Sequence, residues 1–230
     1  MGALAEGIAG LEERLRYRRI VGVERIPESV ARGLLELLGA VESISKQGLG
    51  SDLERVAEEL RGCSRCGLHR SRSTIVVGEG NPRARLVFVG EGPGEEEDAQ
   101  GRPFVGPAGQ LLTKIIQAMG LRREDVYIAN VVKCRPPANR TPKPDEISAC
   151  KPFLVRQLRA IGPKVICALG GVSTQTLLEK SERISRLRGR FHPWEGIPVM
   201  PTFHPSYLLR NPEKKRVVWE DVKQVMEMLK

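Results

Sequence analysis

The sequence has few aromatic residues and no long apolar run. Of its 230 residues, 40% are hydrophobic and 4% are aromatic. A membrane-spanning helix needs about 20 consecutive apolar residues, so we expect no membrane partner. The first residues, MGALAEGIAGLEERLRYRRI, carry acidic side chains and lack the apolar core of a secretory signal. We therefore expect a cytoplasmic protein.

Cysteine is also scarce, and its odd count of five argues against a disulfide framework. Cys63 and Cys66 are separated by two residues, and Cys134 and Cys150 by fifteen. Four thiolates in two pairs suit either tetrahedral zinc or an iron–sulfur cluster, and unrelated buried thiols are the alternative. Cys167, inside the apolar segment VICALGG, is expected to be a core residue.

Acidic residues are fewer than basic ones, 28 against 37, which gives a formal net charge of +9. Such a surplus attracts polyanions and makes nucleic acid a plausible partner. Composition does not decide the matter, because many basic proteins bind no nucleic acid.

The order of apolar segments predicts the fold. Residues 1–60 have helical spacing and are expected to form a helical N-terminal extension, followed by one domain over residues 61–230. In that domain four short apolar runs (RLVFVGEG, VYIANVVKC, PKVICALGG and IPVMPTF) alternate with helical segments. The pattern predicts an α/β fold with a mostly parallel central sheet flanked by helices on both faces. Ligands of such sheets bind beyond the carboxyl ends of the strands.

One such strand end continues into GEGPGEEEDAQGRPFVGPAGQ, residues 90–110. The glycines at 90, 92 and 94 suggest a dinucleotide loop, but Glu95 stands where the third glycine of that fingerprint belongs. The crowded carboxylates would also repel a phosphate. Glu95 and Glu96 are expected to be a solvated helix start, since acidic side chains favour helix N-termini. A solvated helix start does not account for Glu91 and Glu97, whose roles remain to be assigned.

Three segments, GEGPGEEEDAQGRPFVGPAGQLL, NVVKCRPPANRTPKPDEISAC and FHPSYLLRNP, together resemble the iron–sulfur uracil-DNA glycosylases of family 4, found in bacteria and archaea. The resemblance runs from about Cys63 to the C-terminus. It implies a three-layer αβα enzyme that flips deoxyuridine out of DNA and hydrolyses the N-glycosidic bond, leaving an abasic site for base excision repair.

The resemblance also implies a cofactor and partners. It assigns a [4Fe–4S] cluster to Cys63, Cys66, Cys134 and Cys150, with zinc as the alternative. The expected substrate is uracil-containing DNA, single- or double-stranded, and the expected enzyme is a monomer. Residues 1–60 lie outside the resemblance and are a candidate contact for a repair or replication partner.

Three residues are implied to bind the base. Phe104 would be the platform on which the flipped uracil stacks. The Asn130 amide would read the uracil edge by accepting from N3–H and donating to O4. His204 would donate to the uracil oxygen that gains charge as the bond breaks.

Two glutamates are candidates for the chemistry at the sugar. Glu97 is expected to position water, and Glu91 to shape the pocket near uracil C5, with the backbone of Gly92 close to the base. The two glutamate roles are exchangeable, because the sequence does not fix which side chain faces the sugar.

The segment after His204 resembles a DNA-insertion loop that includes Ser206. Leu208 or Leu209 would wedge into the gap left by the flipped base, although either leucine could instead be a core residue. Arg210 would hold a phosphate.

The sequence leaves three other functions open. A related branch traps uracil-DNA covalently through a histidine, and His192 lies in a comparable region. The short loop there, and Gly92 in place of that branch's glutamine, favour turnover. The remaining alternatives are a non-catalytic DNA-binding protein with structural zinc, and an electron-transfer or dinucleotide oxidoreductase. The broken glycine fingerprint disfavours the oxidoreductase.

Overall fold

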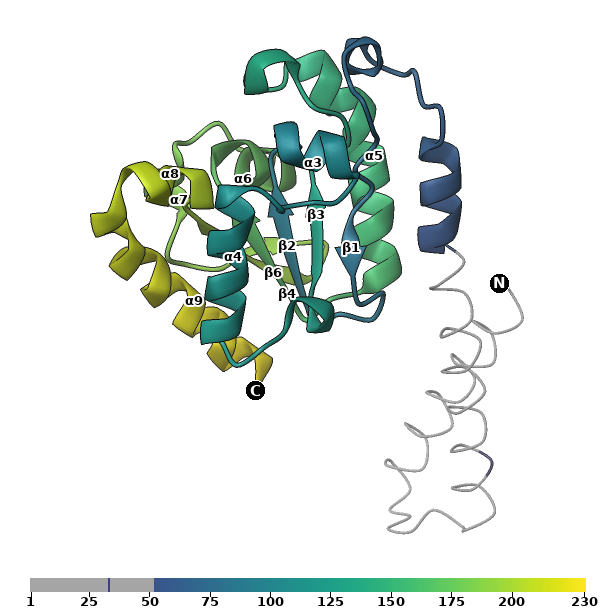
Figure 1. Ribbon diagram of the computed structural model, residues 1–230. Helices are drawn as coiled ribbons and strands as arrows, with labels where there is room; N and C mark the ends of the chain where they lie inside the picture. Colours follow the sequence, from purple (N-terminus) through teal and green to yellow (C-terminus); the bar gives the residue numbers. More distant parts are fainter. Residues whose placement is uncertain (1–32, 34–51) are drawn as a thin grey trace. The chain divides into compact units, whose positions relative to one another are not determined.

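The structure, a computed structural model, describes residue 33 and residues 52–230 (Figure 1). Most of the predicted N-terminal extension therefore lies outside the described residues. Residues 52–60 form a helix, and its Val56 and Leu60 are buried in the core. Glu59 of this helix pairs with Arg156 at 2.7 Å. This helix thus packs against the sheet domain.

A six-stranded sheet forms the centre of the domain, in the order β1-β3-β2-β4-β6-β5. The strands are β1 (Glu79–Gly80), β2 (Leu86–Gly90), β3 (Tyr127–Asn130), β4 (Val165–Leu169), β5 (His192–Trp194) and β6 (Ile197–Thr202). The four inner strands are parallel to one another, and β1 and β5 add antiparallel edges. The mostly parallel sheet predicted from the sequence is confirmed.

Helices cover both faces of this sheet (Figure 1). They are α3 (Glu95–Gln100), α4 (Pro107–Ala118), α5 (Pro144–Ile161), α6 (Gly171–Leu178), α7 (Ile184–Leu187), α8 (Pro205–Arg210) and α9 (Lys215–Leu229), with short 3-10 turns η1 (Gly67–Arg70), η2 (Arg123–Asp125), η3 (Pro137–Asn139) and η4 (Pro212–Lys214). Within the described part of the chain, no helix is long and apolar enough to cross a membrane.

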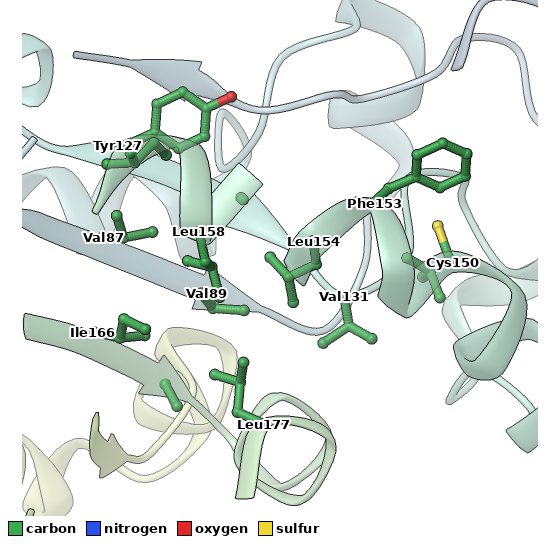
Figure 2. Packing of buried hydrophobic residues seen from close by; sticks show 14 of the residues in the cluster. Val87, Val89, Tyr127, Val131, Cys150, Phe153, Leu154, Leu158, Ile166 and Leu177 are labelled. Carbon is green, nitrogen blue, oxygen red and sulfur yellow. The ribbon is translucent and has the colours of Figure 1, made fainter. Parts of the chain in front are cut away.

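Alternation along the strands divides the core into two layers. Val87 of β2 points to the face covered by α5, where it belongs to one cluster with Leu154 and Leu158 (Figure 2). Its neighbour Phe88 points to the opposite face and packs with Leu112 of α4. Each fully buried leucine stabilises the fold by roughly 2 kcal/mol. The sheet is therefore the middle layer of the predicted three-layer αβα arrangement.

The segment expected to be an insertion loop is helical. α8 begins at Pro205, whose fixed φ and missing N–H suit the first position of a helix. His204 is the N-cap, and its side chain accepts a hydrogen bond from the backbone amide of Ser206. This cap fixes His204 at the end of β6, beside the other strand ends.

Candidate active site

A cavity of about 440 Å³ lies beyond the carboxyl ends of the inner strands. Its lining includes eight residues that the sequence analysis singled out: Glu91, Gly92, Glu97, Phe104, Asn130, His204, Ser206 and Arg210. The lining also includes nine other residues: Pro93, Gly94, Ala108, Pro136, Asn139, Arg140, Gly170, Gly171 and Tyr207.

Gly90 makes room for two of these side chains at once. A Cβ on Gly90 would lie 2.4 Å from Asn130 Oδ1 and 2.5 Å from the Phe104 ring. Gly90 and Asn130 are also register partners at the ends of β2 and β3. The amide and the aromatic ring can therefore share one corner of the cavity only because residue 90 has no side chain.

Asn130, which lines the cavity, has a buried and unused acceptor. The residue is only 2% exposed, and its Oδ1 has no hydrogen-bond partner among the described residues. An unsatisfied buried acceptor costs roughly 1–3 kcal/mol. A ligand that brought an N–H group to this oxygen would remove that cost.

His204 is held as a neutral imidazole with a defined tautomer. Its Nδ1 accepts from the backbone amide of Ser206 at 3.1 Å and lies 2.8 Å from Ser206 Oγ. An amide is always a donor, so Nδ1 carries no proton and the ring proton sits on Nε2. Burial lowers the pKa of His204 to about 4, assisted by the charge of Arg210 and opposed by that of Glu97. The Phe104 ring lies 5.5 Å away, tilted by 34°.

The Glu97 carboxylate is occupied by the backbone of its own loop. Its Oε1 accepts from the amides of Val105 and Gly106 at 2.8 and 2.9 Å. Its Oε2 accepts from the amide of Gly94 at 3.1 Å. A carboxylate that accepts three backbone hydrogen bonds holds the segment after Phe104 in place.

Glu91 differs from Glu97 in having no such partners. It lines the cavity and is partly buried. Within residues 52–230, no group donates a hydrogen bond to its carboxylate at normal distance. Burial raises the pKa of the Glu91 carboxyl above its ordinary value. Glu91 is thus the cavity carboxylate that is available to water or a ligand.

The other acidic residues of this segment have structural surroundings. Glu95 and Glu96 are exposed in the first turn of α3, as predicted. Asp98, which the sequence analysis passed over, is 3% exposed. Its carboxylate accepts from the backbone amides of Ser73, at 2.9 and 3.0 Å, and Thr74, at 3.2 Å. Asp98 therefore fastens the segment that follows the first cysteine pair to α3.

Four cysteines belong to or pack against one hydrophobic cluster of the core. Cys134 and Cys150 are buried, and Cys63 and Cys66 pack against the same hydrophobic cluster. In the described residues, no three potential ligands stand close enough together to hold a metal ion as they are placed. Burial raises the pKa of Cys150 to about 11. Cys167 is 1% exposed in β4, which confirms it as a core residue.

Two N–H groups point at sulfur atoms of this set. Arg72 donates to Cys134 Sγ at 3.2 Å and to the backbone carbonyl of Cys63 at 2.7 Å. The backbone amide of Lys133 donates to Cys150 Sγ at 3.3 Å. Such donors are typical of sulfur ligands in iron–sulfur proteins.

The two leucines of α8 have different surroundings. Leu208 is 1% exposed and belongs to the core cluster between α4 and α9. Leu209 is 45% exposed, the one large hydrophobic side chain among the described residues that is so exposed. Of the two leucines, only Leu209 has an exposed side chain. Arg210 beside it is exposed and reaches the cavity.

His192 does not reach the cavity described here. It lies in β5, 7% exposed, with Nε2 2.9 Å from the backbone oxygen of Leu187. A histidine in this position is not placed to trap a sugar in that cavity.

Lys133, which was not predicted from the sequence, is completely buried. Its ammonium group donates to the backbone oxygen of Asn130 at 2.7 Å and to Gln157 Oε1 at 2.6 Å. A lysine inside the apolar run VYIANVVKC was the available signal. Its bonds fix the main chain at Asn130.

Comparison with known proteins shows which family the chain resembles in sequence. The profile of the uracil DNA glycosylase superfamily matches residues 77–223. The chain is 53% identical over 182 residues to a type-4 uracil-DNA glycosylase of Thermotoga maritima, covering 77% of this chain and 95% of that one. It is 48% identical over 187 residues to a type-4 enzyme of Saccharolobus solfataricus, covering 77% and 87%. A type-5 uracil-DNA glycosylase of Pyrobaculum aerophilum is 30% identical over 164 residues, covering 64% and 71%.

Proposed function

The chain belongs to the type-4 branch of the uracil-DNA glycosylase superfamily, and on this basis we propose how its cavity removes uracil from DNA. The protein is a uracil-DNA glycosylase, a hydrolase of N-glycosyl bonds that serves base excision repair. The observation that carries the assignment of its site is the unpaired Oδ1 of buried Asn130, beside Phe104 and neutral His204.

Recognition follows from what this corner of the cavity offers. Uracil brings an N3–H donor that pairs with Asn130 Oδ1, while its face stacks on the Phe104 ring. Cytosine has no hydrogen at N3, so Oδ1 would stay unpaired and the cost of its burial would remain. This discrimination between uracil and cytosine requires that the Asn130 amide keep one orientation. The packing of Gly90 against both Asn130 and Phe104 supports that requirement.

Bond cleavage places negative charge on the departing uracil. The Nε2–H of neutral His204 is the donor that would stabilise this charge at a uracil oxygen. Ser206 supports the role, because its backbone amide keeps the proton of the ring on Nε2. A donor fixed before the reaction stabilises the transition state without reorganisation.

The sugar left behind becomes cationic, and water must reach its anomeric carbon. We assign this task to Glu91, whose carboxylate lines the cavity and accepts no hydrogen bond from the described residues. Glu97, the expected candidate, has both oxygens engaged by backbone amides. The geometry supports a different division of roles: Glu91 stabilises the cation and orients water, and Glu97 holds the loop that carries Phe104.

DNA binding uses the rim. Leu209 would fill the space left by the extruded nucleotide, and Arg210 would hold a backbone phosphate, while the net charge of +9 attracts DNA overall. A single chain supplies every element of this site, which supports action as a monomer.

Cys63, Cys66, Cys134 and Cys150 would hold a [4Fe–4S] cluster. Their shared position in the core and the N–H groups directed at two of the sulfurs support this assignment over unrelated thiols. When bound, the group would clip the segment of the first cysteine pair onto the sheet domain. Iron and sulfide analysis with visible absorbance tests the assignment, and zinc without iron would replace it.

The activity is tested with an oligonucleotide that carries one uracil. The purified, metal-loaded protein is incubated with it, and alkaline treatment then cleaves any abasic site. Strand cleavage is expected with uracil, and none is expected when thymine or cytosine occupies the same position. A folded, metal-loaded protein that leaves the uracil oligonucleotide intact would overturn the function. A protein–DNA adduct that survives denaturation would indicate covalent trapping instead.

A further inference from the structure

We propose that Arg123 is a positioning residue, which controls substrate binding by holding the backbone of Phe104 in the conformation that presents its ring to the flipped base. The proposal rests on the function assigned above. Arg123 lies in η2, between α4 and β3, and does not line the cavity. It would therefore act on the base through Phe104.

Phe104 has a backbone conformation that needs support. Its φ is +53°, in the left-handed region that a bulky side chain rarely adopts. The start of α4 is built around it, because a Cβ on Gly109 would lie 2.0 Å from the Phe104 carbonyl group. A residue held in this region persists only when its surroundings fix it.

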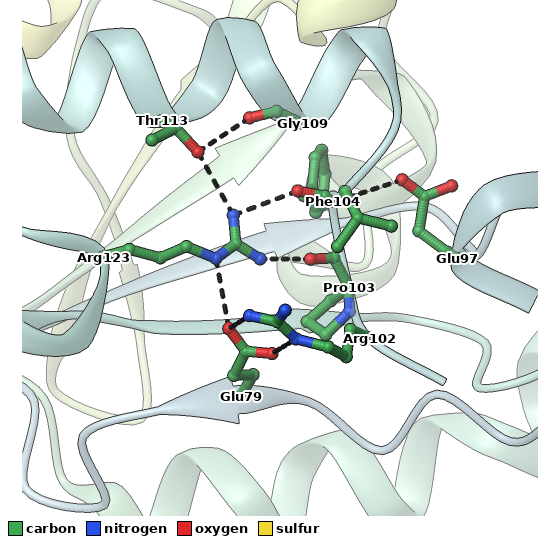
Figure 3. A network of polar contacts seen from close by, with 9 residues as sticks. Glu79, Glu97, Arg102, Pro103, Phe104, Gly109, Thr113 and Arg123 are labelled. Carbon is green, nitrogen blue, oxygen red and sulfur yellow. Dashed lines mark hydrogen bonds and ion pairs between the residues drawn. The ribbon is translucent and has the colours of Figure 1, made fainter. Parts of the chain in front are cut away.

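Arg123 provides that support at the carbonyl side. One terminal nitrogen of its guanidinium donates to the Phe104 carbonyl oxygen at 3.0 Å and approaches Thr113 Oγ1 at 3.4 Å. The other terminal nitrogen donates to the carbonyl oxygen of Pro103. Figure 3 shows the guanidinium facing two consecutive carbonyls, while Glu97 lies on the other side of the loop. The backbone around Phe104 is thus held on one side by Arg123, at the carbonyls of residues 103 and 104, and on the other by Glu97, at the two amides that follow.

The orientation of Arg123 is set in turn by Glu79. The Nε of Arg123 donates to Glu79 Oε1 at 3.2 Å, and Arg102 binds the same carboxylate through two hydrogen bonds of 2.6 and 2.9 Å. Arg102 lowers the pKa of Glu79, with Arg123 adding to the effect, so the carboxylate stays ionised. With Nε committed to Glu79, the two terminal nitrogens face the loop.

This arrangement requires arginine in particular. A guanidinium is a planar group with donors on three nitrogens, and the clamp uses all three. Lysine would keep the positive charge and could replace one of these bonds, but it could not span two carbonyls and a carboxylate. Arg123→Lys therefore separates the geometry of the side chain from its charge.

The test compares Arg123→Lys and Arg123→Ala with the control Arg122→Ala in the full-length, metal-loaded protein. Arg122 is the adjacent arginine and is 71% exposed; it pairs with Glu124 and Asp125. KM and single-turnover rate are measured on the single-uracil oligonucleotide. Loss of base stacking predicts a fall in kcat/KM of about 10-fold or more for both Arg123 variants, mainly through KM. Arg122→Ala should stay within about twofold of the wild type.

A double-mutant cycle with Phe104→Ala distinguishes positioning from general stabilisation. If Arg123 acts through Phe104, the variant Phe104→Ala/Arg123→Lys should lose no more activity than Phe104→Ala alone. Losses that multiply, or wild-type kinetics for Arg123→Lys, would overturn the proposal. If Arg123→Ala does not fold, Arg123→Lys and Glu79→Gln still give the answer, because each loosens the clamp without emptying it.

The outcomes also separate this inference from the function on which it rests. Wild-type protein that is active on uracil while Arg123→Lys is unchanged overturns the positioning role alone. Wild-type protein that is folded, metal-loaded and inactive overturns both.

Discussion

Gly90 and Asn130 stand side by side at the ends of β2 and β3, so close that a methyl group on residue 90 would lie 2.4 Å from Asn130 Oδ1. Gly90→Ala must therefore displace the amide, the Phe104 ring, or both. We expect a fall in kcat/KM on uracil of at least about 10-fold, since the base would lose a hydrogen bond or its stacking.

The control for that variant is Gly67→Ala. A Cβ on Gly67 meets no atom within 4 Å, and we expect its steady-state kinetics to match the wild type. Full activity of Gly90→Ala would mean that Asn130 and Phe104 are free to move, which would contradict the rigid recognition proposed for them.

Glu91→Gln and Glu97→Gln should fail in different ways. Glu91→Gln removes the cavity carboxylate. We therefore expect the single-turnover rate constant to fall by about 100-fold, with little change in melting temperature. Glu97→Gln places an NH₂ group against a backbone amide, so we expect a loss of roughly 1–3 kcal/mol in the free energy of unfolding. Thermal denaturation alongside the kinetics measures both. The reverse pattern would return water positioning to Glu97.

Protonation of Glu91 should cause the fall in rate on the acid side of the pH–rate profile. Burial raises the pKa of this carboxyl above its ordinary value, and a carboxyl is neutral below its pKa. The rate of the chemical step should therefore fall as pH drops through a raised value. Single-turnover rates in overlapping buffers should show this inflection in the wild type and in Glu97→Gln, and a flat profile in Glu91→Gln.

His204 should stay neutral well below pH 6.5, because burial lowers its pKa to about 4. Between those two values the unfolded chain binds a proton at this residue that the folded protein does not. Stability should therefore fall as pH drops from about 6.5 to about 4, by at most about 1.4 kcal/mol per pH unit from this residue.

NMR of ring-labelled histidine measures that titration directly, and the chain has three histidines to assign. His204→Asn should lack the corresponding part of the pH dependence of unfolding. A His204 resonance that titrates near 6.5 would contradict the neutral donor inferred from the bond between Ser206 N–H and Nδ1.

The adjacent leucines of α8 give a matched pair. Leu208→Ala empties a core position and should cost roughly 2–5 kcal/mol of stability. Leu209→Ala removes an exposed side chain, so stability should change by less than about 0.5 kcal/mol while KM for uracil in duplex DNA rises. Chemical denaturation and kinetics on single- and double-stranded substrates separate the two. Equal losses of stability would contradict the burial difference.

Much of the fold could be predicted from the sequence because the inner strands are apolar on both faces. Runs such as VFVG and VICALG leave little alternative to buried parallel strands. The edge strands β1 and β5 were not predicted, since two or three residues are too few to show an alternation. α8 was read as a loop because six residues beginning with proline carry almost no helical period.

Some residues of the site could likewise be predicted from the sequence, and others could not. Asn130 and His204 could be placed from motifs at strand ends. The engagement of Glu97 could not, because its partners are backbone amides, which every residue has and no side-chain pattern reveals. Arg123 was missed for the same reason: it binds carbonyl oxygens of a loop that is distant in the sequence.

Two adjacent carboxylates in α3 face different parts of the molecule. Glu97 anchors the loop that carries Phe104, and Asp98 anchors Ser73 and Thr74, directly after the arginine that contacts two of the four cysteines. α3 thus links the segment after the first cysteine pair to the loop that carries Phe104. We expect a displacement near the cysteines to move this loop through α3. If the four cysteines hold a cluster, its loss should loosen the loop that carries Phe104 before the sheet unfolds.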